Sequence, residues 1–433
     1  MKRAPLPPEA ATAAARPGAS ASGPATRAPR VPGTFLAVYA LVYVGFWIAN
    51  QAPLVITLAV RVDALVPEAD RAATLGLILG VGAFVGLITN PVAGRLSDRT
   101  TAKWGQRRPW ILVGATGTLG GAAVMAFAAD VPTLLGGYFL TSVFVNILGA
   151  MLIAMIADQI PERQRGVASG VAGITLPIGL VGGSFLVQVL APDIVLMFLV
   201  PGSLAFFLVL PFLFTLRDKR LEKSDRPPFG MRDLVRTFYV SPRQHRDFSW
   251  AFTSRFLVQL AAAFVTTYLA YYLIDHLGAS AESAPSLVFQ GLLALSIATM
   301  VAAPLGGKLS DLLRRRKIFV LLAAVIFGIA FFMLASGSTV PAFLVAMAVA
   351  GVGYGAYNAV DLALVTDVLP DPEDTAKDLG VFNMAATLPQ TLAPVLAPII
   401  LAIGDGSYGV LYTVGGVLGL LGAIAILPVR KTR

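Results

Sequence analysis

The chain has 433 residues, of which 56% are hydrophobic and only 13% are charged. Soluble proteins carry about 25% charged residues, so this composition excludes an ordinary soluble domain. The absence of cysteine excludes disulfides and thiolate metal sites, and two histidines are too few for a histidine metal cluster. We therefore expect no metal and no cofactor.

The first 33 residues are rich in Ala, Pro, Ser and Arg and contain no apolar run. They predict a disordered tail, because a cleaved signal peptide would need an apolar core after its basic start. From Phe35 onward, apolar blocks of roughly 20 residues follow one another, which is the length that a helix needs to cross about 30 Å of hydrocarbon. A β-barrel would instead show alternating segments of about ten residues.

We predict an all-α membrane protein with twelve transmembrane helices. The strongly charged segment 217–247 separates six spans from six. The predicted domains are a disordered cytoplasmic tail at 1–33, a six-helix bundle at 34–216, a cytoplasmic central loop at 217–247, a second bundle at 248–428 and a cytoplasmic tail at 429–433. The predicted spans are 35–60, 72–93, 110–129, 132–157, 166–190, 194–216, 248–274, 286–307, 317–336, 340–366, 378–403 and 407–428.

The positive charges predict the orientation of these spans. With both termini in the cytoplasm, 30 of the 33 Lys and Arg residues fall in cytoplasmic segments. Arg61 and Arg71 fall outside and Arg255 falls within a span. The net charge of +9 is therefore explained by membrane orientation and not by nucleic-acid binding. We expect a monomeric, multi-pass protein of the cell membrane whose partners are lipid, a small solute and protons.

Three pairs of segments show that the chain contains an internal repeat. In order along the chain, 94–98 matches 307–311, 158–161 matches 367–370, and 175–177 matches 387–389. The offsets are 213, 209 and 212 residues. An even number of spans precedes the second copy, so the two halves run parallel and form two pseudo-symmetric bundles.

The first of these segments resembles the signature of a known family. Gly94-Arg95-Leu96-Ser97-Asp98-Arg99-Thr100, followed by Gly105-Gln106-Arg107-Arg108-Pro109, resembles the loop signature of the major facilitator superfamily. Its ending is similar to that of sucrose/proton symporters and of glycoside–pentoside–hexuronide cation symporters. The resemblance implies a substrate site between the halves near the bilayer midplane. It also implies that the loop is a conformational latch and not a substrate site.

The residues of the implied latch are Gly94, Arg95, Asp98, Arg99, Arg107, Arg108 and Asp158, with Asp311 and Asp367 in the second copy. We expect Asp98 to lie beside a helix end, where an anion can accept free backbone N–H bonds. The arginines can pair with carboxylates such as Asp158. Making and breaking these contacts would bias the inward-open against the outward-open state. The alternative is that the arginines only follow the positive-inside rule.

Two ionisable residues are predicted inside the membrane. Asp361 lies about 9 Å of helix rise before Asp367, and Arg255 lies about two turns into the seventh span, so their depths are similar. Ionisable residues in the membrane are costly and mark functional sites by default. We predict that they form a pair or a protonation switch. The alternatives are a static ion pair and a water-exposed position.

The uncharged polar residues suit a sugar site. The resemblance implies that spans 1, 4, 7 and 10 line a cavity and that spans 2, 5, 8 and 11 flank it. We predict that the cavity is lined by Asn50, Gln51, Asn146, Gln259, Tyr268, Asn358 and Asn383. The alternative is that the amides join helices by hydrogen bonds. Tyr271 and Tyr272 lie near the outer end of their span, so we expect them in the interfacial aromatic belt.

These features predict secondary active transport of a sugar or glycoside by proton symport. The alternative within the superfamily is a proton-driven efflux antiporter. The span at 166–190 lacks the Gly-Pro step typical of such antiporters. A membrane sensor would normally need an added soluble domain. No Walker motif supports ATP-driven transport, and no carboxylate or histidine cluster supports an enzyme.

Overall fold

The computed structural model describes residues 31–216, 218, 220–221, 245–280, 282–313, 315–368 and 375–429. Residues 1–30 and 430–433 of the predicted tails and most of the predicted central loop lie outside these residues. The first half contains α1 (Gly33–Ala52), η1 (Pro53–Thr57), α2 (Leu58–Leu65), α3 (Glu68–Asp98), α4 (Arg108–Ala126), α5 (Val131–Gln159), α6 (Glu162–Leu190) and α7 (Ile194–Thr215). The second half contains α9 (Arg246–Tyr271), η3 (Tyr272–His276), α10 (Ala284–Leu313), α11 (Arg316–Ser336), α12 (Val340–Val368), α13 (Thr375–Ile403) and α14 (Tyr408–Ala425).

The described chain is helical because a backbone in hydrocarbon must satisfy its own hydrogen bonds. Aspartate side chains cap the N-terminal ends of two of these helices. Asp130 accepts a hydrogen bond from the backbone N–H of Thr133 at 2.7 Å, which caps α5. Asp193 caps α7 in the same way through the N–H groups of Val195 and Leu196. Twelve helices of the described part are long and apolar enough to cross a membrane, which confirms the predicted number.

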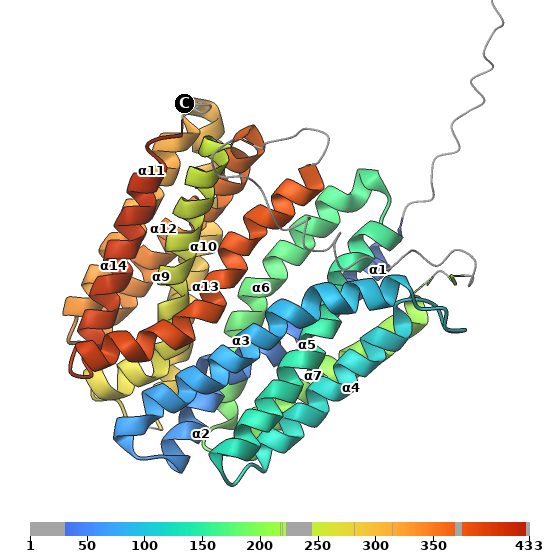
Figure 1. Cartoon of the computed structure of the whole chain (residues 1–433), viewed down its shortest axis with the longest axis horizontal. Helices are drawn as coiled ribbons and strands as arrows, with labels where there is room; N and C mark the ends of the chain where they lie inside the picture. The colour runs from blue at the N-terminus through green and yellow to red at the C-terminus, as the bar shows by residue number, and fades with distance from the viewer. Residues whose placement is uncertain are drawn as a thin grey trace, which may run out of the picture.

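The helices form two bundles with the same internal packing. In the first half, α5 packs against α3 and α4, and α1 packs against α6 and α7. In the second half, α12 packs against α10 and α11, and α9 packs against α13 and α14 in the same pattern. Figure 1 shows the two bundles as separate blue-green and yellow-red groups. The sequence repeat is therefore a structural repeat.

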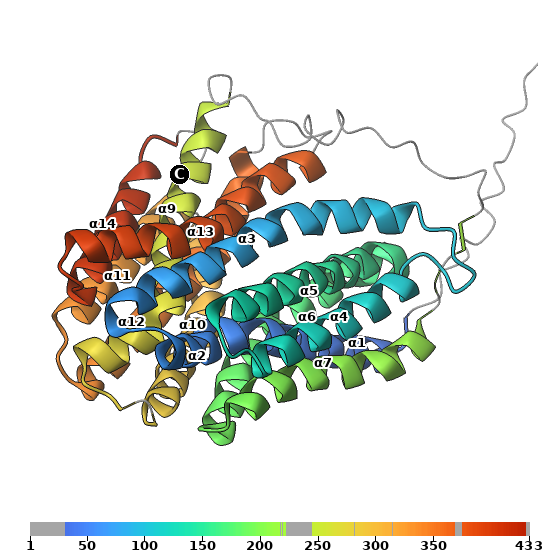
Figure 2. The same cartoon turned by 60° about the horizontal axis from the view of Figure 1, so that its bottom comes forward.

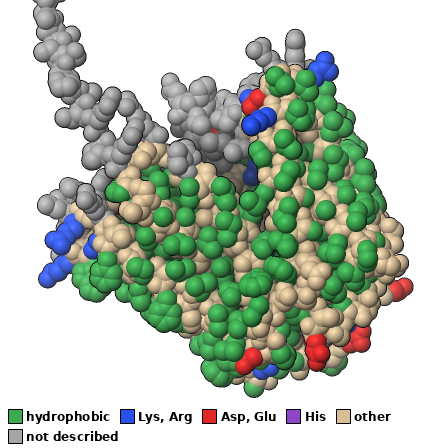
Figure 3. All heavy atoms as spheres, turned by 180° about the vertical axis from the view of Figure 1, so that it is seen from behind, with side chains coloured by type: hydrophobic (Ala, Val, Ile, Leu, Met, Phe, Trp, Pro, Cys, Tyr) green, Lys and Arg blue, Asp and Glu red, His purple; other side chains and the backbone are tan. Residues whose placement is uncertain are grey.

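The two ends of the molecule carry opposite charge. We call the end that holds Asp98 and Asp311 the latch end, and the other end, where α3 begins and α9 finishes, the far end. In Figure 3, most of the visible Lys and Arg side chains lie in two groups, at the upper right and at the left edge, and most of the Asp and Glu side chains lie at the lower right. A broad apolar surface lies between them. Such a band is what a lipid-embedded protein requires.

The halves touch each other towards the far end. Figure 2 shows α3 beside α13, and a Cβ added to Gly76 of α3 would lie 2.4 Å from the backbone oxygen of Pro394. The rings of Phe185 and Phe289 meet with their centroids 5.5 Å apart and join α6 to α10. Near the latch end, a Cβ added to Gly94 would have nothing within 4 Å. The halves are therefore closed together at the far end.

The structure corrects the prediction that the repeated Gly-x-x-Ser-Asp segments are loops. Residues 94–98 form the last turn of α3, which ends at Asp98, and residues 307–311 lie within α10. Hydropathy shows where a chain stops being apolar, whereas the backbone hydrogen bonds of a helix continue into the polar interface.

Candidate functional site

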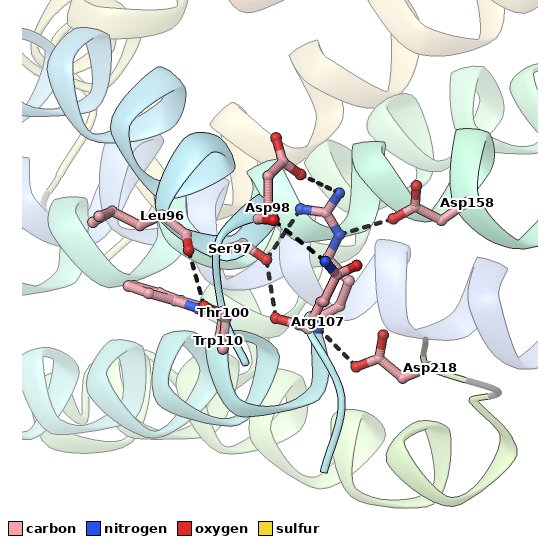
Figure 4. A network of polar contacts seen from close by, with 9 residues as sticks. Leu96, Ser97, Asp98, Thr100, Arg107, Trp110, Asp158 and Asp218 are labelled. Carbon is pink, nitrogen blue, oxygen red and sulfur yellow. Dashed lines mark hydrogen bonds and ion pairs between the residues drawn. The ribbon is translucent and has the colours of Figure 1, made fainter. Parts of the chain in front are cut away.

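The latch residues meet around the guanidinium of Arg107. Its Nη2 lies 2.6 Å from Oδ1 of Asp98, and its Nε donates to Oδ2 of Asp158 at 2.8 Å. Its Nη1 donates to Oγ of Ser97 at 3.0 Å. Figure 4 shows these side chains converging from α3, α5 and the start of α4. Arg107 is only 7% exposed, so it is a buried cation held by two carboxylates from different helices.

Burial opposes the charge on Arg107, but the hydrogen bond and charge of Asp158 and the charge of Asp98 outweigh it and raise the pKa of the guanidinium. The arginine therefore remains protonated and can reach both acids at once. Its planar fork of donors suits this better than an ammonium group would.

The segment before α4 is shaped by a residue that sequence reasoning missed, Asp218. Its Oδ2 accepts hydrogen bonds from the backbone N–H groups of Arg107 and Arg108 at 2.7 and 2.9 Å. These are unpaired donors at the start of α4, where the helix dipole favours an anion. Gly105 has a φ of 112°, and a Cβ there would lie 2.2 Å from the same carboxylate oxygen. The signal in the sequence was an acid just after the sixth span, together with Gly105.

The second copy repeats part of this arrangement. Arg316 lies 3.5 Å from Oδ1 of Asp311 and donates from Nη1 to the backbone oxygen of Ala363 in α12 at 2.8 Å. The side chain of Asp367, which matches Asp158, lies outside the described residues. Arg316 thus joins α10 to α12. This helix pair is the repeat equivalent of α3 and α5, which Arg107 joins.

The basic residue that follows each of these arginines contacts the end of the sixth helix of its own half. Arg108 donates from Nη2 to the backbone oxygen of Leu216, just after α7. Lys317 donates from Nζ to the backbone oxygens of Leu427 and Val429, just after α14. Cations at the C-terminal end of a helix satisfy its last carbonyls and its dipole.

Three other predicted latch residues lie at the C-terminal end of α3. Arg95 lies in the last turn of α3 and Arg99 is its C-terminal cap. Asp98 closes the C-terminal end of α3, where the helix dipole is unfavourable to an anion. Its described partner is the side chain of Arg107, so a side-chain cation takes the place of the backbone N–H groups that we expected.

Inside the second bundle, Arg255 of α9 and Asp361 of α12 form an ion pair. Nη1 of Arg255 lies 2.6 Å from Oδ2 of Asp361, whose side chain is 0% exposed. The guanidinium also lies over the ring of Phe382, 4.9 Å from its centroid. Beside the pair, the hydroxyls of Ser254 and Tyr357 are 3.2 Å apart. The pair joins α9 to α12.

The polar groups around this pair keep unused bonding capacity. Oδ1 of Asp361, Nε of Arg255 and Oε1 of Gln259 are buried, and none has a hydrogen-bond partner among the described residues. Buried polar atoms without partners cost free energy and need a functional or structural explanation. Gln259 lies one helical turn beyond Arg255, on the same face of α9.

The other predicted cavity residues do not form a single cluster. Asn146 and Asn358 donate from Nδ2 to the backbone oxygens of Ser142 and Tyr354, one turn earlier in their own helices, at 2.8 and 2.9 Å. Tyr268 is fully buried between the halves. Asn50 and Gln51 are partly buried, and Asn383 is exposed. No hydrogen bond between any two of these residues is found in the described part of the chain.

Tyr271 and Tyr272 are not belt residues, which corrects the prediction made for them. Both side chains are 0% exposed. The hydroxyl of Tyr271 donates to the backbone oxygen of Ala59 in the other half at 3.1 Å, and that of Tyr272 donates to the backbone oxygen of Leu334 at 2.8 Å. Depth along a helix identified the end at which they lie but not the face on which they lie.

The architecture and the paired arginine clusters define a multi-pass membrane protein of two repeated six-helix bundles. The chain belongs to the Major Facilitator Superfamily, whose sequence pattern matches residues 35–297 and 252–433. The twelve candidate spans in its described part agree with a multi-pass membrane protein of that superfamily.

Individual relatives are similar only in part. The sucrose transport protein SUC3 of Arabidopsis thaliana is 29% identical over 124 residues, covering 24% of this chain and 21% of the relative. The multi-drug resistance efflux pump PmrA of Streptococcus pneumoniae is 26% identical over 274 residues, covering 61% of this chain and 64% of the relative. The chain thus spans less than two thirds of these curated relatives.

Solved structures show the same fold. The nucleoside transporter NupG superposes with a TM-score of 0.71 at 12% identity, covering 91% of this chain and 99% of that one. An inward-facing bacterial homologue of the lysosomal transporter Spinster gives a TM-score of 0.66 at 15% identity, covering 92% and 98%. At these identities the likeness concerns the fold alone.

Proposed function

We propose that the protein is a secondary active transporter that carries a sugar or glycoside across the cell membrane together with protons. The observation that carries this proposal is the Arg255–Asp361 pair, in which a fully buried carboxylate is held by an arginine. A carboxylate in a membrane domain is retained at high cost, and proton relays commonly use such groups.

The chemistry of the pair suits coupling. When Asp361 is ionised, it neutralises Arg255 and ties α9 to α12. When it binds a proton, its attraction for the guanidinium is lost, and Arg255 is free to bind an oxygen of the solute. Gln259 and the hydroxyls of Ser254 and Tyr357 supply further donors and acceptors of the kind that sugar hydroxyls require.

Orientation and gating complete the proposal. The latch end carries most of the described Lys and Arg residues, so we place it, with both termini, in the cytoplasm. The Arg107 cluster then acts as a latch whose contacts change as the halves rock. The protein would act as a monomer, because each chain contains both six-helix bundles.

The likeness to sucrose transport protein SUC3 supports uptake of a sugar, whereas the likeness to PmrA supports the second candidate, proton-driven efflux. The two candidate functions need different binding sites. A sugar needs several hydrogen-bonding partners, which the cluster around Arg255 provides, whereas a lipophilic cation would have to be bound beside an arginine.

The test is a reconstitution of the purified protein in liposomes that contain a pH-sensitive dye. A panel of sugars that includes sucrose is added outside, and a second panel contains lipophilic cations such as tetraphenylphosphonium. The proposal predicts that a sugar gradient moves protons in the same direction. Proton movement opposite to a lipophilic cation, with no response to any sugar, would establish efflux instead.

A further inference from the structure

A second buried ion cluster lies at the far end and connects the two halves. Arg71 at the start of α3 is 8% exposed. Its Nη1 lies 2.6 Å from Oδ1 of Asp63 and its Nη2 lies 3.2 Å from Oε1 of Glu68, both in its own half. Its Nη2 also pairs with Oδ1 of Asp275 in η3 of the other half. We call Asp63, Glu68, Arg71, Tyr271 and Asp275 the Arg71 cluster.

Aromatic side chains of the second half strengthen this connection. The ring of Tyr271 lies 5.3 Å from the guanidinium carbon of Arg71, and its hydroxyl donates to the backbone oxygen of Ala59. One helical turn earlier, the hydroxyl of Tyr268 lies 3.3 Å from the backbone oxygen of Ala72. Both hydroxyls bond to the backbone of the first half, so the halves are held together by polar contacts as well as by packing.

We propose that the Arg71–Asp275 ion pair holds the far end closed and that its release is the step that opens this end between the halves. The three carboxylates around Arg71 differ in the half of the protein to which they belong. Asp63 and Glu68 travel with Arg71 when the halves separate, so the arginine keeps partners in both states. Of the three carboxylates, only Asp275 must part from the arginine. The loss of this charge-assisted pair therefore shifts the balance towards the separated state, together with the hydroxyl contacts of Tyr268 and Tyr271 that also cross between the halves.

The burial of the pair explains why it can bias this balance. The side chains of Arg71 and Asp275 are 10% and 20% exposed, whereas Glu68 is 84% exposed. Buried charge pairs are screened far less than exposed ones, so the loss of Asp275 matters and the loss of Glu68 does not. This role of the Arg71–Asp275 pair does not depend on the solute that the protein carries.

The chain has no cysteine, so labels can be introduced without removing native ones. Ala129, between α4 and α5, and Ser338, between α11 and α12, are exposed positions at the far end of different halves. Spin labels on A129C/S338C in lipid nanodiscs report the separation of the halves by double electron–electron resonance. We expect Asp275→Asn to raise the population at longer distance about tenfold or more, the effect of losing one charge-assisted hydrogen bond.

Glu68→Gln is the matched control, because it removes a carboxylate from the same guanidinium without touching the other half. It should leave the distance distribution unchanged. Arg71→Gln gives a second route to the same result and should resemble Asp275→Asn. Each variant is measured only if it is monodisperse after purification. An unchanged distance distribution in Asp275→Asn or in Arg71→Gln would overturn the proposal. Equal shifts in Asp275→Asn and Glu68→Gln would also overturn it.

Discussion

Gly105→Ala tests the arrangement that positions Arg107. The backbone at Gly105 has a φ of 112°, in the left-handed region, and the added methyl group would lie 2.2 Å from Oδ2 of Asp218. A non-glycine residue held in such a conformation costs about 1–3 kcal/mol. The methyl group must also displace the carboxylate that receives the backbone N–H groups of Arg107 and Arg108.

The magnitude follows from these two effects. Hydrogen bonds to a charged group contribute about 1.5–3 kcal/mol each, but two bonds to one oxygen are not independent. We therefore expect a loss of about 3 kcal/mol in the free energy of unfolding. For a protein of this size, such a change lowers the melting midpoint by roughly 3 °C.

The assay is thermal unfolding of the purified protein in detergent at a fixed heating rate. Gly94→Ala is the matched control, because Gly94 is helical and a Cβ there meets nothing within 4 Å. It should leave the midpoint unchanged or raise it slightly, since alanine favours a helix. Equal midpoints for Gly105→Ala and the wild type would refute the role assigned to Asp218.

Three further predictions concern contacts elsewhere. Arg107→Lys keeps the charge but loses the planar guanidinium that reaches both Asp98 and Asp158, so the transport rate in proteoliposomes should fall about tenfold. A wild-type rate would argue against the latch. Gly76→Val places a side chain against the backbone oxygen of Pro394 in the other half, so A129C/S338C spin labels should show longer distances. Unchanged distances would count against closure of the halves at the far end. Tyr272→Phe leaves the backbone oxygen of Leu334 without its hydroxyl donor, so the free energy of unfolding should fall by about 1–3 kcal/mol. An unaltered thermal unfolding midpoint would contradict this.

The sequence was sufficient for the fold because membrane helices are defined by length and hydropathy, and the repeat fixed how the halves correspond. It also brought Arg255 and Asp361 together, since helix rise converts residue number into depth. It did not define helix ends, as Gly94–Asp98 shows, because a helix continues beyond the apolar core.

Contacts between distant segments could not be predicted in the same way. Asp218 binds the N–H groups at the start of α4 across 111 residues of chain, and no periodicity reports such a contact. Arg71 counted only as an exception to the positive-inside rule, although acids at 63, 68 and 275 were a signal that it would be paired. Tyr271 was placed at the correct end of its helix but on the wrong face, because the packing of the two halves decides which face is buried.

The most direct test of proton-coupled transport is Asp361→Asn, which removes the charge but keeps the shape of the buried carboxylate. The sugar that moves protons in the wild-type liposomes is supplied with and without a pH gradient. We predict that the variant still exchanges labelled for unlabelled sugar but loses accumulation driven by the pH gradient. Full pH-driven accumulation by Asp361→Asn would contradict the account.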